Sequence, residues 1–171
     1  VGAGLVGSLL AIYLVKRGYK VSVFERRFDL REHLIDGGRS INMALSSRGI
    51  KALEEVGLAS QLKQTAVPMT GRMIHDVSGN LTFQPYGKQG EFINSISRAG
   101  LNMVLTTEAE KLGVEFFFEH RCTGVDFSKT EITFQVHAAT LHKQFDVIIG
   151  ADGAFSAVRG SMMFTDRFEY S

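Results

Sequence analysis

The stretch VGAGLVGSLLAIYLV, at Val1–Val15, decides the fold class because it joins a glycine-rich turn to an apolar helical run. Gly2, Gly4 and Gly7 have the G-x-G-x-x-G spacing of a dinucleotide-binding turn. There the first glycine permits the tight bend, the second lets a pyrophosphate approach, and the third lets helix and strand pack closely. Unpaired N–H groups at the start of the helix would face the phosphates. The stretch predicts an α/β fold with a nucleotide site.

The next stretch, YKVSVFE at 19–25, supplies the acidic residue that such a site uses. Val21 and Val23 alternate as in a short strand, which ends at Glu25, about 20 residues after the glycines. A carboxylate there can accept hydrogen bonds from both hydroxyls of an adenosine ribose. Only Val1 precedes the first glycine, whereas the turn needs a strand to deliver the chain to it. We therefore expect a βαβ unit that lacks its first strand.

The remainder of the chain carries start and stop signals for further helices and strands. We expect a polar loop at 26–38, a helix capped by Ser46 or Ser47 and ended by Gly57, a short helix at 59–64, a hairpin turning at Ser78-Gly79-Asn80, a strand at 91–97 and a helix at 98–112. Four strand-like runs follow as far as Ile149. They predict a meander that feeds a buried strand at Val147–Ile149.

Composition and charge narrow the classes of partner. The 19 basic and 18 acidic side chains nearly cancel, so the charge balance favours neither nucleic acid nor an anionic membrane surface. Cys122 is the single cysteine, which excludes an intrachain disulfide and favours a reducing compartment. The histidines have no spacing typical of a metal site, and no apolar run is long enough for a membrane helix. Arg26, Arg27 and Arg31 form either a phosphate patch or a solvated loop.

A second motif lies near the other end of the chain, in DVIIGADGAFSAVR at 146–159. Asp152 and Gly153 follow the expected buried strand, where α/β sheets bind their ligands. The stretch resembles the Asp-Gly motif of the flavin-dependent aromatic hydroxylases, whose FAD domain is glutathione-reductase-like. The resemblance implies that Asp152 and Gly153 lie beside the cofactor's pyrophosphate. The alternative is that Asp152 only caps the helix that follows.

Five further stretches (FERR, GRSINMALSSRG, RMIH, QPYG and SISRAGLN) are similar to the kynurenine 3-monooxygenases within that family, and the likeness runs from Gly2 to the tail RFEYS. It implies an α/β, glutathione-reductase-like Rossmann FAD-binding domain with an inserted β-rich substrate segment, truncated at both ends. Residues 1–171 would be a partial FAD-binding domain in which about 68–97 contributes to the substrate-binding sheet. Such a fragment is expected to be inactive alone.

The resemblance also implies roles for individual residues, and no catalytic side chain among them. The residues expected to contact FAD are Gly2, Gly4, Val6, Gly7, Phe24, Glu25, Arg26, Arg27, Ala44, Arg98, Cys122, Asp152, Gly153 and Ala157. Arg72 and Tyr86 match the pair that binds the carboxylate of L-kynurenine. A guanidinium can hold a carboxylate by two hydrogen bonds, and a phenol adds one directed donor. Cys122 has the alternative of being a small buried apolar residue.

The implied reaction is hydroxylation of L-kynurenine to 3-hydroxykynurenine, with FAD as cofactor, NADPH as co-substrate and O₂. We expect no nucleic-acid partner and no membrane segment in this stretch of sequence. A homodimer is expected, in the cytoplasm or, in a eukaryote, at the mitochondrial outer membrane, because eukaryotic members carry a C-terminal anchor. Three alternatives stay open: a flavin-dependent hydroxylase of another aromatic acid, an NAD(P)-dependent dehydrogenase, which has no need of the Asp-Gly segment, and a non-catalytic FAD-binding domain.

Overall fold

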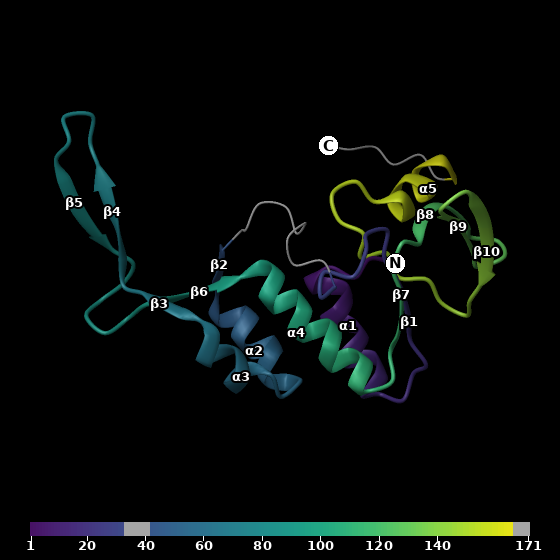
Figure 1. Cartoon of the computed structure of the whole chain (residues 1–171), viewed down its shortest axis with the longest axis horizontal. Coiled ribbons are helices and arrows are strands. Elements are labelled where there is room, and N and C mark those ends of the chain that lie inside the picture. Colours follow the sequence, from purple (N-terminus) through teal and green to yellow (C-terminus); the bar gives the residue numbers. More distant parts are fainter. Residues whose placement is uncertain (33–41, 166–171) are drawn as a thin grey trace. The chain divides into compact units, whose positions relative to one another are not determined.

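A computed structural model of the chain describes residues 1–32 and 42–165 (Figure 1). The described residues of Val1–Gly38 and Asn102–Ser171 form one compact unit, and those of Arg39–Leu101 form a second. The expected polar loop is described only as far as Glu32, and the tail RFEYS lies outside the described residues.

The first unit begins with the predicted turn, helix and strand. Helix α1 spans Leu5–Val15, and strand β1, Ser22–Phe24, pairs in parallel with β7, Glu115–Phe117. Backbone hydrogen bonds bring the start of the chain beside β1, because Gly2 N donates to Phe24 O over 2.8 Å. The buried side of α1 consists mainly of small residues, which allows the helix to pack closely.

A three-stranded antiparallel meander forms the other part of this unit. Its strands are β8 (Arg121–Asp126), β9 (Glu131–Val136) and β10 (Ala139–Gln144), in the order β10-β9-β8, and helix α5 (Ala157–Thr165) follows. The buried core comprises Phe24, Cys122, Ile132, Phe134 and Val158. The ring of Phe24 stacks on those of Phe117 and Phe134, with centroids 4.7 and 4.4 Å apart. The core therefore joins β1 to the meander.

The predicted meander was wrong in two respects. The run at β7 does not belong to it, because β7 pairs with β1. Strand β10 was not predicted; it follows a tight turn at His137, which has a φ of 50°. The predicted buried strand at Val147–Ile149 is not a regular strand, and Val147 is 73% exposed. Its backbone bonds are to Val1 alone among the described residues: Val1 N donates to Ile149 O, and Ala151 N donates to Val1 O. A single paired residue does not make a ladder.

The second unit contains helices, a three-stranded sheet and a separate two-stranded sheet. Its elements are β2 (Asn42–Leu45), α2 (Ser47–Glu55), α3 (Ala59–Thr65), β3 (Val67–Met69), β4 (Gly71–His75), β5 (Leu81–Pro85) and β6 (Ile93–Ser97), followed by the start of α4 (Arg98–Lys111). Ser46 caps α2 by accepting from Gly49 N, and Gly57 follows its end with a φ of 85°. The helices and the hairpin fall where the sequence predicted them.

Strands β2 and β3 were not predicted. Both are short and pair with opposite edges of β6, in the order β2-β6-β3. Pro68 lies in β3, at the edge of the sheet, where the missing N–H is tolerated. Strands β4 and β5 form a separate two-stranded sheet, turned by Asp76, whose carboxylate accepts from the backbone N–H groups of Ser78 and Asn80.

Candidate functional site

The glycine turn and the Asp-Gly segment touch each other through their backbones. Gly2 has a φ of 99°, and a Cβ built on it would lie 2.5 Å from Ala151 O and 2.9 Å from Asp152 Cα. A Cβ on Gly7 would overlap the carbonyl oxygen of Gly2, whereas one on Gly4 would meet nothing within 4 Å. Two glycines are thus required by close packing, and the third leaves open space at the start of α1.

Side chains from three elements hold the peptide groups of Ala3, in the middle of the turn. Glu25 Oε2 accepts a hydrogen bond of 2.9 Å from Ala3 N, and its other oxygen accepts from Arg27 N over 3.0 Å. Asn102 Nδ2, on α4, donates to Ala3 O over 2.8 Å, and Ser8 Oγ donates to the same oxygen over 3.3 Å. The sequence reasoning named neither Ser8 nor Asn102, although Asn102 ends the stretch SISRAGLN.

Asp152 binds the start of α5 with one carboxylate oxygen. Its Oδ2 accepts from Ala157 N over 2.7 Å and from Val158 N over 3.3 Å. Burial acts to raise the pKa of Asp152, but hydrogen bonds from Ser156 and from these backbone N–H groups outweigh it, so the pKa lies below its ordinary value. The alternative that Asp152 caps the following helix thus accounts for Oδ2 only. The other, Oδ1, is buried and has no hydrogen-bond partner among the described residues.

The other expected cofactor residues of this unit divide into exposed and buried groups. Val6, in the first turn of α1, is 70% exposed, and Arg26 and Arg27 are exposed as well. The side chains of Phe24, Cys122 and Ala157 pack in the apolar core, so they can face a ligand only with their main chains. Burial is the first cause of a raised pKa for the Cys122 thiol.

Arg31 is committed to ion pairs and leaves the arginine cluster with two members. Its guanidinium lies 2.5 Å from Asp29 Oδ2 and 2.5 Å from Glu110 Oε2. Side-chain hydrogen bonds from Arg31 to Glu110 and then to Asp29 raise its pKa further above the ordinary value. This arginine therefore braces the loop after β1 against α4 and is not a free phosphate ligand.

The expected substrate residues lie in the second unit, on the β4–β5 hairpin. The register places Arg72 directly opposite Gln84, and Tyr86 N donates to Thr70 O over 2.9 Å, so the ladder continues past Pro85. Because side chains alternate along a strand, Arg72 and Tyr86 lie on the same face. Tyr86 is 42% exposed. Gln84, which the sequence reasoning did not name, accepts a 2.7 Å hydrogen bond from Arg72 Nε.

Two further expected cofactor residues are exposed in this unit. Ala44 lies on β2 opposite Ser95, and Arg98 is the first residue of α4. Ser97 precedes it, and its Oγ accepts from Gly100 N over 3.2 Å. Ala44 thus lies on an edge strand of its sheet, and Arg98 lies at the start of a helix.

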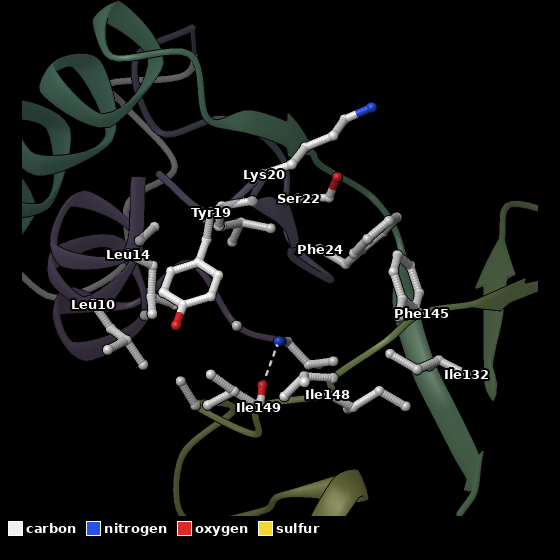
Figure 2. Close-up of a pocket in the computed structure, with 18 of the residues that line it drawn as sticks. Leu10, Leu14, Tyr19, Lys20, Ser22, Phe24, Ile132, Phe145, Ile148 and Ile149 are labelled. Carbon is white, nitrogen blue, oxygen red and sulfur yellow. Dashed lines mark hydrogen bonds between the residues drawn. The ribbon is translucent and has the colours of Figure 1, made fainter. Parts of the chain in front are cut away.

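A pocket of about 660 Å³ lies behind the glycine turn, on the side of α1 and β1 (Figure 2). Leu10, Leu14 and Tyr19 line one part of it, and Ile148 and Ile149 line another. Gly4, Glu25 and Asp152 are absent from its lining. The pocket is therefore a different place from the open space at the start of α1.

Within residues 1–32 and 42–165, no group of three or more histidine, cysteine or acidic side chains could hold a metal ion. In the same ranges, no helix has the length and apolar character needed to cross a membrane.

Solved structures of an oxygenase and a monooxygenase have the same fold. The structure resembles 2-methyl-3-hydroxypyridine-5-carboxylic acid oxygenase, with a TM-score of 0.72 and 25% identity over 94% of this chain and 40% of that one. It also resembles p-nitrophenol 4-monooxygenase of Pseudomonas putida, with a TM-score of 0.76 and 22% identity over 94% of this chain and 42% of that one. The fold is that of the FAD-binding domain of aromatic hydroxylases, with mixed helices and strands.

The chain belongs to the FAD binding domain family, whose model matches residues 1–169. It is 52% identical over 165 residues to a kynurenine 3-monooxygenase of Cytophaga hutchinsonii, covering 92% of this chain and 36% of that protein. It is 48% identical to one of Myxococcus xanthus, covering 95% of this chain and 36% of that protein, and 43% identical to one of Caenorhabditis elegans, covering 99% and 41%. The chain thus spans about two fifths of the length of these relatives. The resemblance inferred from the motifs is confirmed.

Proposed function

We propose that this chain is the FAD-binding part of a monooxygenase that converts L-kynurenine to 3-hydroxykynurenine with NADPH and O₂. The observation that carries the proposal is its 52% identity, over 165 residues, to a protein named kynurenine 3-monooxygenase. The packing of the glycine turn against the Asp-Gly segment supports the same proposal, because both motifs then face one ligand.

The residues at the turn fit a dinucleotide pyrophosphate. Gly4 leaves space where a phosphate can approach the backbone, and the first turn of α1 has no acidic side chain that would repel it. The buried Asp152 Oδ1 lacks a partner among the described residues; a phosphate has no donor to offer it, so a hydroxyl group of the cofactor or an ordered water would satisfy it. These features favour FAD at the turn over an empty glycine loop.

Glu25 would serve the ribose and the turn together. Each of its oxygens accepts one backbone N–H, which leaves lone pairs for ribose hydroxyls. Arg26 and Arg27 would face the adenosine and diphosphate as exposed cations, beside Val6. Phe24, Cys122 and Ala157 would contribute main-chain contacts only, as would Gly2, Gly7 and Gly153.

The remaining expected contacts lie in the second unit. Ala44 would contact the flavin through its backbone, and Arg98 would reach the phosphate or ribityl region as a fixed cation. Arg72 and Tyr86 would bind the substrate carboxylate; their shared face on the hairpin supports this role.

Bound FAD would supply the redox chemistry, with NADPH as reductant and O₂ as oxidant. The work left to this chain is to hold the cofactor, orient the aromatic ring of kynurenine through its carboxylate, and exclude water. No described side chain needs to act as a nucleophile or as an acid–base catalyst. The reaction class therefore agrees with binding residues that include no nucleophile.

We also propose a glutathione-reductase-like Rossmann arrangement, in which about 68–97 is an inserted substrate segment of residues 1–171. Two observations support it: β1 and β7 are parallel, and β3 to β6 belong to the second unit, not to the unit that holds β1 and β7. A homodimer, in the cytoplasm or at the mitochondrial outer membrane, rests on the resemblance alone.

The test is to purify the full-length protein, measure its flavin absorbance, and follow NADPH oxidation with and without kynurenine. We expect bound FAD, stimulation by kynurenine, and 3-hydroxykynurenine by chromatography. A protein without flavin that oxidises or reduces a nicotinamide cofactor would favour a dehydrogenase. Bound flavin with no response to kynurenine would favour a hydroxylase of another aromatic acid or a non-catalytic domain.

A further inference from the structure

The hairpin residue Gln84 has a position that suggests a role in the carboxylate site. It lies directly opposite Arg72, and its Oε1 accepts the 2.7 Å hydrogen bond from Arg72 Nε. Tyr86 follows two residues later, and the bond from Tyr86 N to Thr70 O keeps it in the ladder. Since alternate residues share a face, Arg72, Gln84 and Tyr86 form one row of exposed polar side chains.

The hydrogen bond from Arg72 Nε restricts how the guanidinium can bind an anion. A guanidinium can bind a carboxylate through either of two bidentate edges. One edge consists of Nε and a terminal nitrogen, and the other consists of the two terminal nitrogens. Gln84 occupies Nε, so the terminal edge remains for the ligand. The same bond restrains a long and otherwise mobile side chain before the ligand arrives.

The chemistry of the glutamine side chain suits this role. Its carbonyl oxygen is a neutral acceptor, which can take one N–H of the guanidinium. Being uncharged, Gln84 does not compete with a carboxylate for the arginine, as an acidic residue in its place would. The row therefore presents donors from two side chains, the terminal edge of the Arg72 guanidinium and the phenol of Tyr86, while Gln84 holds the guanidinium in place.

We infer that Gln84 is a positioning residue of the substrate carboxylate site, which fixes the edge that Arg72 presents to the amino-acid carboxylate. This inference rests on the proposed function. It goes beyond it by adding a third residue and by giving the direction from which the carboxylate approaches Arg72.

The test is Gln84→Met in the full-length protein, which keeps the length of the side chain and removes the acceptor. We expect the KM for kynurenine to rise about three- to tenfold, the loss of one neutral hydrogen bond, while kcat and FAD content stay unchanged. Thr82→Val is the matched control, because Thr82 lies on the same face but opposite Ile74. Its KM should equal that of the wild type.

Two further measurements separate positioning from a general effect on the hairpin. The decarboxylated analogue of kynurenine should have the same KM with the wild type and with Gln84→Met, whereas a structural defect would change both substrates. In an Arg72→Met background, Gln84→Met should add nothing, because Gln84 acts through Arg72. An equal rise in both backgrounds, or no rise from Gln84→Met when Arg72→Met raises the KM, would overturn the inference. An unchanged KM in both single variants would overturn the proposed substrate site itself, and the inference with it.

Discussion

The glycine turn and the β4–β5 hairpin are held in place by different means. At the turn, backbone packs on backbone, because Gly2 and Gly7 have no space for a Cβ. Both the N–H and the C=O of Ala3 are hydrogen-bonded by side chains. On the hairpin, all residues of β5 are exposed, and the notable side-chain contact on the polar face is the single bond from Arg72 to Gln84. Substitutions at the turn should therefore lower both stability and FAD affinity, whereas those on the hairpin should lower only the affinity for substrate.

The largest effect is expected from Gly7→Ala, because its Cβ would overlap the Gly2 carbonyl and neither backbone can move freely. We expect a loss of about 3 kcal/mol or more in the free energy of unfolding, together with the loss of FAD. Gly4→Ala is the control, since nothing lies within 4 Å of its Cβ. It should unfold like the wild type in a urea titration but bind FAD more weakly. Equal stability of the two variants would contradict the close packing.

Glu25→Ala should have the next largest effect. It leaves Ala3 N without its acceptor and removes the ribose contacts, so stability should fall by about 1–3 kcal/mol and FAD should be lost on dialysis. Kynurenine affinity of the FAD-loaded variant should be unchanged. Glu54→Ala, which breaks only an exposed pair with Lys63, should retain its flavin. Normal flavin retention by Glu25→Ala would indicate a structural glutamate instead.

Tyr86→Phe removes one directed donor from the hairpin and leaves the ring. The KM for kynurenine should rise about two- to tenfold, corresponding to one hydrogen bond, and FAD content should not change. Tyr19→Phe, at an exposed tyrosine of the first unit, should have no effect on the KM. Steady-state kinetics at saturating NADPH would measure both. A lower FAD content in Tyr86→Phe would contradict the prediction that substitutions on the hairpin leave FAD binding unchanged.

The smallest effect concerns pH. Because the pKa of Asp152 is below its ordinary value in the folded chain, its contribution to stability is present above the unfolded value of 3.8 and is lost as the pH falls through the folded pKa. Asp152→Asn should therefore lose less stability than the wild type between pH 5 and pH 3, by roughly the contribution of this one carboxyl. Urea unfolding across that range would measure the difference. Parallel curves would show that Asp152 does not gain from its hydrogen bonds.

Local signals in the sequence predicted the turn and most helices correctly. G-x-G-x-x-G, the cap at Ser46 and the turn at Ser78-Gly79-Asn80 each depend on neighbours in the chain, and each lies where it was expected. Strands β2 and β3 were missed because they are short and exist by pairing with β6, far along the chain. β10 was missed because a turn at His137 needs a positive φ in a residue other than glycine.

The roles of single residues at the site show the same division. Glycines and acidic residues with a fixed spacing could be identified, whereas Asn102 contacts Ala3 across 99 positions and has no local signature. Gln84 depends on the hairpin register, because a shift of one residue would turn it away from Arg72. Contacts that depend on tertiary structure or on strand register therefore could not be predicted from the sequence.

The most direct test of the division between turn and hairpin is the kynurenine dissociation constant of Arg72→Met, measured from the change in flavin absorbance at equal FAD occupancy. Losing a bidentate, charge-assisted contact should raise the constant about ten- to a hundredfold, with FAD content unchanged. Arg48→Met, at an exposed arginine on α2 of the same unit, should match the wild type. An unchanged dissociation constant in Arg72→Met, or loss of FAD from it, would contradict the account.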